Sequence, residues 1–311
     1  METCVYHTPV LLEPSVDGLN VHGSGVYVDV TLGGGGHSRE ILRRLGSGGR
    51  LFSFDQDRDA IAKCQMDNGQ WTMDNGQWTM VHSNFRYLGN WMRYYGVDSI
   101  DGLIADLGVS GHHLDAGERG FSFRWDAALD MRMNRAGGMT AADVVNSYDV
   151  DALCDVLMLY GELKGARRIA DAIVKARARG AIRTTGELAR IVDLHDKKDL
   201  ARMFQALRIE VNHEMDALRD MLMSAVDLLA PGGRLVVLSY HSLEDRIVKR
   251  VMRCGSDSGE MERDVFGNSH APLRPIGKAV VPTAEEVARN PRSRSAKLRI
   301  AEKRGCAAVE S

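Results

Sequence analysis

Short apolar runs alternate with amphipathic stretches along most of the chain. Runs rich in Val, Ile and Phe that are bounded by glycine or polar residues are typical of buried strands, and apolar residues three or four positions apart are typical of helices. The pattern therefore predicts an α/β fold built on a doubly wound sheet. The predicted strands are Val26–Val30, Arg50–Phe54, Thr79–His82, Ile100–Leu107, Arg234–Ser239 and Lys297–Ala301.

The spacing of these strands is interrupted once. About 125 residues separate the fourth predicted strand from the fifth, whereas a crossover between neighbouring strands takes a few tens of residues at most. An inserted domain is the simplest explanation. We expect residues 1–111 and 214–311 to form one discontinuous domain and residues 112–213 to form the insert.

The insert is expected to be helical. Apolar residues recur at helical spacing through residues 152–178, and a second helix is indicated at residues 188–194. One long helix from about Phe204 to Leu229 should then lead back into the sheet. It should end at the turn Ala230–Gly233, whose Pro-Gly-Gly sequence interrupts a helix.

The first strand is followed by four glycines, Gly33–Gly36, and then by a helical stretch. Glycines let a ligand approach the backbone, and the helix N-terminus adds a partial positive charge, so this turn favours a nucleotide-like ligand. A plain loop is the alternative. Ser38 stands where the dinucleotide fingerprint has its third glycine, which weighs against a dinucleotide.

Polar and aromatic side chains stand at the carboxyl ends of four predicted strands. They are Asp29, Asp55, Phe85 and Asp106. Ligands of open α/β sheets bind at this edge, and a carboxylate about 20 residues past the glycines accepts hydrogen bonds from ribose hydroxyls. Asp55 could also cap the following helix, and Phe85 could be ordinary core. The four placements together predict a site for an adenosine-containing ligand.

Composition sets the context of that site. At 311 residues the chain can hold a sizeable core, and its formal net charge of −2 excludes any argument from overall basicity. The five cysteines form no C-x-x-C pair, which favours a reducing compartment and no structural zinc. No metal-ligand cluster, signal peptide or membrane-spanning run stands out, so a cytoplasmic protein is expected.

Two local clusters of basic residues are candidates for contacts with phosphate groups. A charge run is usually a solvated helix face, but Asp171 is the only acidic residue that opposes the run of the insert in sequence. Its candidate contacts are Lys164, Arg167, Arg168 and Lys175, and those of the second cluster are Arg292 and Arg294. A separate feature, the seven-residue sequence of Met66–Thr72, recurs at Met73–Thr79 and is interpreted as a lengthened surface loop.

Eight longer stretches match one known family in sequence and in order, over nearly the whole chain. They are His7–Leu12, Asp29–Ser38, Asp106–Ser110, Glu118–Phe123, Leu129–Met133, Phe204–Asn212, Ser239–Lys249 and Asn290–Glu302. These stretches resemble the bacterial small-subunit (16S) ribosomal RNA N4-cytosine methyltransferases, the MraW/RsmH type. The resemblance implies a class I S-adenosylmethionine-dependent methyltransferase, with a Rossmann-like domain interrupted by a helical substrate domain.

Carried over position by position, the resemblance also implies a set of contacts to S-adenosylmethionine. A further contact falls on His113, where the family usually has glutamine, and a histidine does not reproduce the geometry of an amide. A homodimer is compatible with the sequence, which leaves the oligomeric state open. The other implied cofactor contacts are Gly35, Gly36, His37, Asp55, Phe85 and Asp106.

The implied reaction is direct, non-covalent methyl transfer to the exocyclic amine of a cytosine in the decoding centre of 16S ribosomal RNA. Such a transfer needs an acceptor for the amine N–H groups. Asp106 is the candidate catalytic acceptor, with cofactor binding as its alternative role. His241 and Glu244 are secondary candidates for positioning the base, with helix capping as the alternative. A DNA or small-molecule methyltransferase, or a non-catalytic RNA-binding protein, would each leave part of the pattern unexplained.

Overall fold

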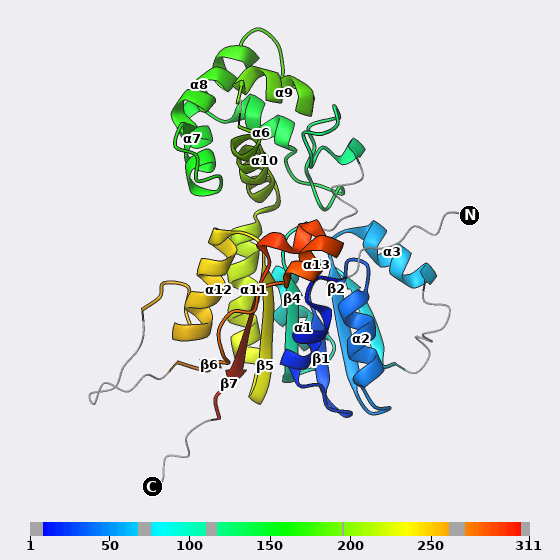
Figure 1. The fold of residues 1–311 in the computed structure, drawn as a ribbon. Coiled ribbons are helices and arrows are strands. Elements are labelled where there is room, and N and C mark those ends of the chain that lie inside the picture. Colours follow the sequence, from blue (N-terminus) through cyan, green and yellow to red (C-terminus); the bar gives the residue numbers. More distant parts are fainter. Residues whose placement is uncertain (1–8, 68–75, 110–116, 195, 261–270, 306–311) are drawn as a thin grey trace. The chain divides into compact units, whose positions relative to one another are not determined.

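The computed structural model describes residues 9–67, 76–109, 117–194, 196–260 and 271–305. The chain divides into two compact units, unit 1 from residues 1–108 and 216–311 and unit 2 from residues 109–215 (Figure 1). None of the helices in the described ranges combines the length and the apolar character needed to cross a bilayer.

Unit 1 is built on one seven-stranded sheet with the order β3-β2-β1-β4-β5-β7-β6. The first five strands are parallel, and β7 is antiparallel to both of its neighbours. The strands are β1 (Val26–Asp29), β2 (Arg50–Asp55), β3 (Trp78–His82), β4 (Ile100–Asp106), β5 (Leu229–Ser239), β6 (Leu273–Pro275) and β7 (Lys297–Lys303).

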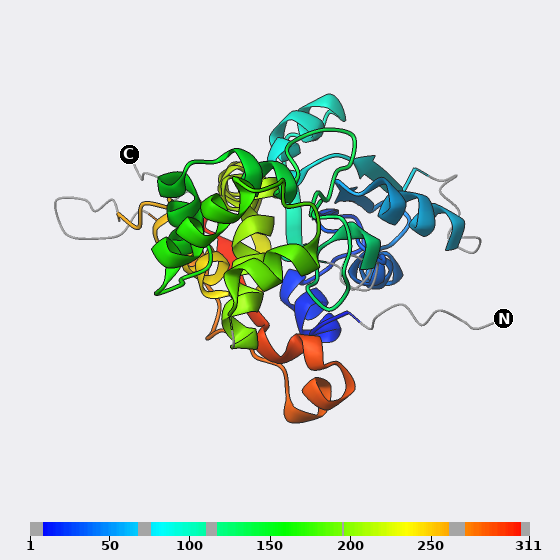
Figure 2. The ribbon, with the colours of Figure 1, turned by 90° about the horizontal axis from the view of Figure 1, so that it is seen from above.

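Helices cover both faces of this sheet. In Figures 1 and 2, α1 and α2 lie on one face and α4 on the other. Arg86 donates to Asp220 across 2.7 Å, which ties the segment before α4 to α11. The helices of unit 1 are α1 (Leu12–Leu19), α2 (Gly36–Arg44), α3 (Arg58–Asp67), η2 (Phe85–Tyr87), α4 (Leu88–Tyr94), α11 (Glu214–Leu228), α12 (Ser242–Cys254), α13 (Ala284–Arg289) and η4 (Pro291–Ser295).

The core of unit 1 follows from the alternation of its strands. Tyr27, Leu51 and Ile104 are fully buried on three neighbouring strands, and Val16 and Ile41 pack on them from α1 and α2. Burial of such side chains stabilises a fold by roughly 1.5–3 kcal/mol each. This packing fixes the strand ends from which the candidate site is built.

Unit 2 is helical in its described part, with a core of its own that includes Leu153, Ile173 and Leu207. Its elements are η3 (Gly117–Arg119), α6 (Ala141–Ser147), α7 (Val150–Leu159), α8 (Ala166–Arg177), α9 (Thr185–Val192) and α10 (Lys197–Asn212).

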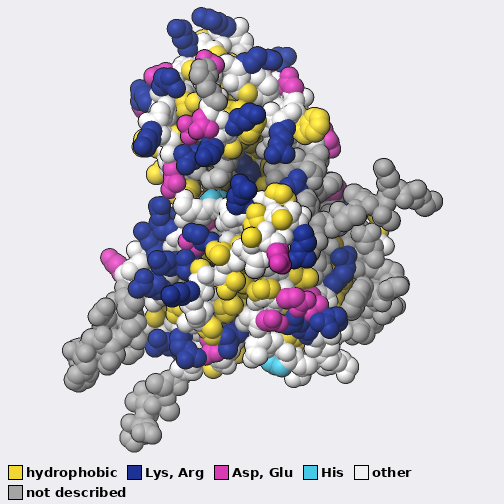
Figure 3. Space-filling model, viewed as in Figure 1, with side chains coloured by type: hydrophobic (Ala, Val, Ile, Leu, Met, Phe, Trp, Pro, Cys, Tyr) yellow, Lys and Arg dark blue, Asp and Glu magenta, His cyan; other side chains and the backbone are white. Residues whose placement is uncertain are grey.

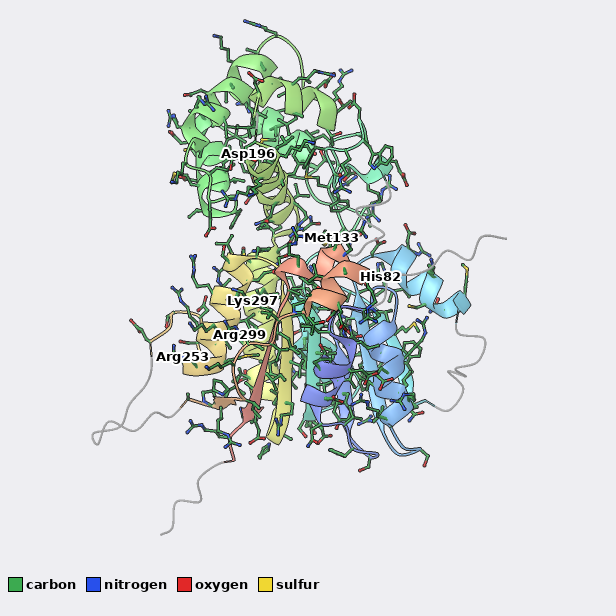
Figure 4. The ribbon with its side chains drawn as sticks, in the orientation of Figure 1. His82, Met133, Asp196, Arg253, Lys297 and Arg299 are labelled. Atoms are coloured by element: carbon green, nitrogen blue, oxygen red, sulfur yellow. The ribbon has the colours of Figure 1, made fainter. Side chains whose placement is uncertain are left out.

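Three of the stretches that carry the family resemblance meet inside unit 2. The Asn212 side chain donates to the Met131 carbonyl and accepts from the Met133 amide, at 2.8 Å each. The buried Arg119 guanidinium donates to the carbonyls of Arg132 and Met133 (Figure 4 labels Met133). These residues therefore hold the loop after η3 against α10.

The bounds of two predicted helices and the place of one predicted turn are wrong. The expected helix from Phe204 to Leu229 is two helices, because His213 adopts a left-handed φ of 48° at the end of α10. The pattern over residues 152–178 is likewise two helices, α7 and α8, and Glu162 between them has a φ of 49°. The expected turn at residues 230–233 lies inside β5, where the ladder to β4 jumps from Leu229 to Arg234.

Candidate functional site

The turn between β1 and α2 leaves little space for side chains. Gly33 and Gly35 have φ angles of 49° and 74°, in the left-handed region that glycine enters without strain. A Cβ atom on Gly36 would lie 2.0 Å from Cγ of Pro9, so a side chain there would displace the preceding segment. The turn therefore presents the N-terminus of α2 to a ligand without intervening side chains.

A buried polar network fixes α2 to the sheet behind this turn. Ser38 Oγ donates to Asp29 Oδ2 at 2.6 Å and lies 2.8 Å from Ser53 Oγ, which also accepts from Trp78 Nε1. Asp29, Ser38 and Ser53 are each at most 1% exposed. The serine at the position of the third fingerprint glycine thus has a structural reason: it links α2 to β1 and β2.

Asp55 lies at the end of β2 and faces the glycine turn. Its Oδ2 accepts from the Gly33 amide at 2.9 Å, and its Oδ1 accepts from the Asp57 amide at 2.8 Å. The N–H of Asp59 in the first turn of α3 is bound by Asp57 instead, at 3.0 Å. A carboxylate at this position is a suitable acceptor for the hydroxyl groups of a diol.

Phe85 follows β3 and begins the short helix η2. Its side chain is half-buried, and Asn84 fixes the entry to the helix by accepting from the Arg86 amide at 2.9 Å. Phe85 thus comes from the strand next to β2, on the same edge of the sheet as Asp55.

Asp106 ends β4 and is the most heavily constrained carboxylate of the site. Its amide donates to Thr31 Oγ1 at 2.7 Å, its Oδ1 accepts from Tyr240 Oη at 2.6 Å, and its Oδ2 lies 3.9 Å from His37 Nδ1. Burial raises the pKa of Asp106, while His37 and the hydrogen bond from Tyr240 act in the opposite direction. Its carboxylate is therefore a better proton acceptor than an ordinary aspartate.

Tyr240 belongs to the site although the sequence pattern did not indicate it. Burial raises the pKa of Tyr240 far above its usual value, and the neighbouring Asp106 charge raises it further. The phenol is therefore a permanent donor at working pH. The only available signal was its position directly after β5, on the same edge as the other strand ends.

His37, in the first turn of α2, is 5% exposed, and its Nε2 has no hydrogen-bond partner among the described residues. A buried polar atom without a partner is costly, so a ligand atom at this position would be stabilising. His37 therefore adds a buried polar atom to the candidate ligand site that the glycine turn and Asp55 form.

His241 and Glu244 cap α12. The Glu244 Oε2 atom accepts from the Tyr240 and His241 amides at 2.8 and 3.4 Å, and His241 Nδ1 accepts from the Glu244 amide at 3.5 Å. This is a reciprocal capping box. The geometry supports the capping alternative, and it gives His241 no described contact with Asp106.

The remaining predicted site residues fall in different places. His113 lies outside the described residues, as do positions 68–75 of the repeated sequence. Lys164 and Arg168 line a hollow of about 280 Å³ in unit 2, together with Asp199 and Arg202. Lys175 is exposed on α8.

Two arginines of the basic clusters have contacts that the sequence did not indicate. Arg167 forms an ion pair with Asp151 of α7 and a second one, at 3.7 Å, with Asp171. Asp171 is therefore not its only acidic partner. Arg292 and Arg294 lie in η4, where Asn290 caps the helix by accepting from the Arg292 amide. The Arg294 side chain is exposed.

The strand order, the antiparallel β7 and the glycine turn facing Asp55 together define a class I S-adenosylmethionine-dependent methyltransferase. The unpartnered His37 Nε2 and the side-chain-free turn fit that cofactor. Comparison with protein families narrows the class: residues 4–304 match the model described as the MraW methylase family, and the chain belongs to this family.

Curated relatives agree along nearly their whole length. The chain is similar to the Ribosomal RNA small subunit methyltransferase H of Bacteroides thetaiotaomicron, with 56% identity over 96% of this chain and 98% of the relative. The protein of the same name from Flavobacterium johnsoniae is 51% identical over 97% and 99%. A solved structure, a putative rRNA-methylase from Clostridium thermocellum, matches 96% of this chain and 99% of that one at 12% identity and a TM-score of 0.44, too weakly to carry an argument.

Proposed function

We propose that this methyltransferase acts on small-subunit ribosomal RNA and transfers the methyl group to the N4 amine of one cytosine in the decoding centre. The relatives, named as ribosomal RNA small subunit methyltransferases at 51–56% identity, support the RNA substrate. The observation that carries the chemistry is Asp106, a partly buried carboxylate with one oxygen that accepts a hydrogen bond from Tyr240. Its Oδ2 accepts no hydrogen bond within the described ranges.

S-adenosylmethionine, when bound, supplies a methyl group on a sulfonium that departs as neutral S-adenosylhomocysteine. The new N–CH₃ bond forms as the S–CH₃ bond breaks, and the amine loses one N–H proton. The lone pair of a cytosine amine is delocalised into the ring, so the enzyme must orient the amine and accept its N–H groups. No covalent bond between enzyme and base is required.

Asp106 is proposed as that acceptor. Tyr240 donates to Oδ1, and Oδ2 lies 3.9 Å from His37 Nδ1. A carboxylate at this position stabilises the positive charge that develops on the amine nitrogen. Its raised pKa also favours uptake of the departing proton.

Unit 2 is proposed as the part that recognises the RNA. The exposed cations Lys164, Arg168 and Lys175 are offered there as phosphate contacts, and Arg294 in η4 is offered in unit 1. A target base must leave its stack to reach a buried methyl donor, so contacts to the flanking backbone are expected.

The test is methyl transfer from labelled S-adenosylmethionine to small ribosomal subunits that lack their own modifications, with the product nucleoside identified by mass. We expect N4-methylcytidine at a single position. Asp106→Asn should abolish transfer while calorimetry shows that cofactor affinity is retained. Loss of cofactor affinity in this variant would instead assign Asp106 to cofactor binding, and a different product nucleoside would refute the proposed target.

A further inference from the structure

Helix α12 of unit 1 carries a basic stripe, defined here as Arg246, Lys249, Arg250 and Arg253. All four side chains are exposed. Their spacing of three, four and seven residues places them on one face of the helix. The opposite face is apolar and buried through Ile247, Val248, Val251 and Met252, so the helix is fixed to the sheet with its cations outward. Figure 3 shows Lys and Arg side chains gathered over this part of unit 1.

Three acidic side chains near the stripe are already engaged. Glu244 is 2% exposed in the capping box. Asp245 accepts from Arg299 at 2.6 Å and from Lys297 at 3.3 Å, so this group of three carries a net positive charge. The Asp257 carboxylate lies 2.9 Å from Arg219 Nε.

Neighbouring residues of β7 extend the positive surface. The Lys297 side chain is 48% exposed, and α12 packs against both β6 and β7. Figure 4 shows Arg253 on α12 and Lys297 and Arg299 on the adjoining strand. The chain as a whole has a net charge of −2, so this local excess of cations is not a reflection of the overall composition.

We infer that the basic stripe binds the phosphate backbone of the RNA substrate, on the same unit that holds the cofactor rim. The inference rests on the proposed function for the identity of the polyanion. From Arg246 to Arg253 the helix rises about 10 Å, so its four cations can contact more than one phosphate of the strand. Such contacts carry no sequence information; they position the strand.

The test compares two double variants of the full chain. Lys249→Ala/Arg253→Ala removes two stripe cations that have no acidic partner among the described residues. Arg50→Ala/Arg93→Ala removes two exposed arginines from β2 and α4 and serves as the charge-matched control. Affinity for unmodified 16S ribosomal RNA transcript is measured between about 50 and 200 mM salt, where each phosphate contact contributes about 0.7–0.9 to the slope of log affinity against log salt. Methyl transfer and cofactor affinity are measured alongside.

We expect the slope of log affinity against log salt to be about 1.5 smaller in magnitude for the stripe variant than for the wild type. Cofactor affinity should be unchanged, and the control variant should keep the wild-type slope. Equal slopes in the two variants, or no RNA binding by the wild type, would overturn the stripe. If the stripe variant loses slope but the wild type methylates no ribosomal substrate, the stripe stands and the proposed function fails.

Discussion

The Tyr240 phenol donates to the Asp106 carboxylate at 2.6 Å, although 134 positions separate the two residues in the chain. The contact joins the ends of β4 and β5, which are neighbours in the sheet. It fixes the orientation of the carboxylate and leaves Oδ2 as its accepting atom.

Replacement of Tyr240 by phenylalanine tests this relationship. The hydrogen bond lowers the pKa of Asp106, so its loss should raise that pKa and move the acid limb of the pH–rate profile to higher pH. We expect kcat to fall about tenfold, in line with the roughly 1.5 kcal/mol of a charged hydrogen bond. Cofactor affinity, measured by calorimetry, should change little. An unshifted acid limb would show that Tyr240 does not act through Asp106.

Ser38→Ala should destabilise unit 1. The change leaves the Asp29 carboxylate, which is 1% exposed, without its 2.6 Å donor. A buried acceptor left unsatisfied costs about 1–3 kcal/mol, which denaturant unfolding resolves. Ser24→Ala, at an exposed position, is the control and should unfold at the wild-type midpoint. Equal midpoints would mean that the network adds nothing to stability.

Gly120→Ala should destabilise unit 2. Gly120 has a φ of 73°, and a Cβ there would lie 2.2 Å from the Ala128 carbonyl oxygen. Strain and overlap together predict a loss of about 2 kcal/mol or more. Hydrogen exchange resolved along the chain should show the loss in unit 2. Gly137→Ala meets no atom within 4 Å and is the matched control.

Glu40 on α2 should make the stability of unit 1 depend on pH in the acid range. Hydrogen bonds from Arg43 and then Arg44 lower the pKa of Glu40 from 4.5 to about 2. Arg44 also pairs with Glu13 and Asp17 of α1, so the cluster joins two helices. Because the folded-state pKa is lowered, the stabilisation is complete above about 4.5 and disappears as the pH falls toward 2.

Glu40→Gln should therefore cost about 1 kcal/mol at neutral pH, a figure kept small because the Arg43 partner is mostly exposed. The difference from wild type should shrink below pH 4.5. Unfolding midpoints measured across this pH range decide the matter, with the exposed Glu260→Gln as control. A difference that stays constant with pH would exclude the linkage.

The two neighbouring arginines of α8 should differ in their effect on RNA binding. Arg167 is paired with Asp151 and Asp171, whereas Arg168 lines the hollow beside Lys164. We expect Arg168→Glu to weaken RNA binding more than Arg167→Glu does, with cofactor affinity unchanged in both. An equal effect on RNA affinity would remove the special role of Arg168.

The parallel part of the sheet was predictable because its signals are local. Residues 26–29 and 50–55 are short apolar runs that end in a carboxylate, and the glycine turn follows the first of them. The pairing of β7 between β5 and β6 was not predictable, since a strand's choice of neighbours depends on contacts far away in sequence. The helix break at His213 was not predictable, because the residue with the left-handed φ is a histidine and not a glycine.

The candidate site divides in the same way. Asp55 and Asp106 were found from their places at strand ends, where spacing along the chain is informative. Tyr240 and the pairing of Arg167 with Asp151 depend on which elements pack together, and nothing in the neighbouring sequence reveals that. The basic stripe does not stand out as a run of charge because its cations alternate in sequence with the apolar residues of the buried face.

The interrupted sheet also has a consequence for synthesis. β4 ends at Asp106 and its partner β5 begins at Leu229, so the 122 residues from 107 to 228 must be made before the sheet can be completed. At a synthesis rate of about 5–20 residues per second, the edge of β4 that pairs with β5 stays unpaired for about 6–24 s during translation. An open strand edge invites pairing with other chains. Unit 2, which is continuous in sequence, can fold during that interval, so the nascent chain gains its helical part before its catalytic sheet is closed.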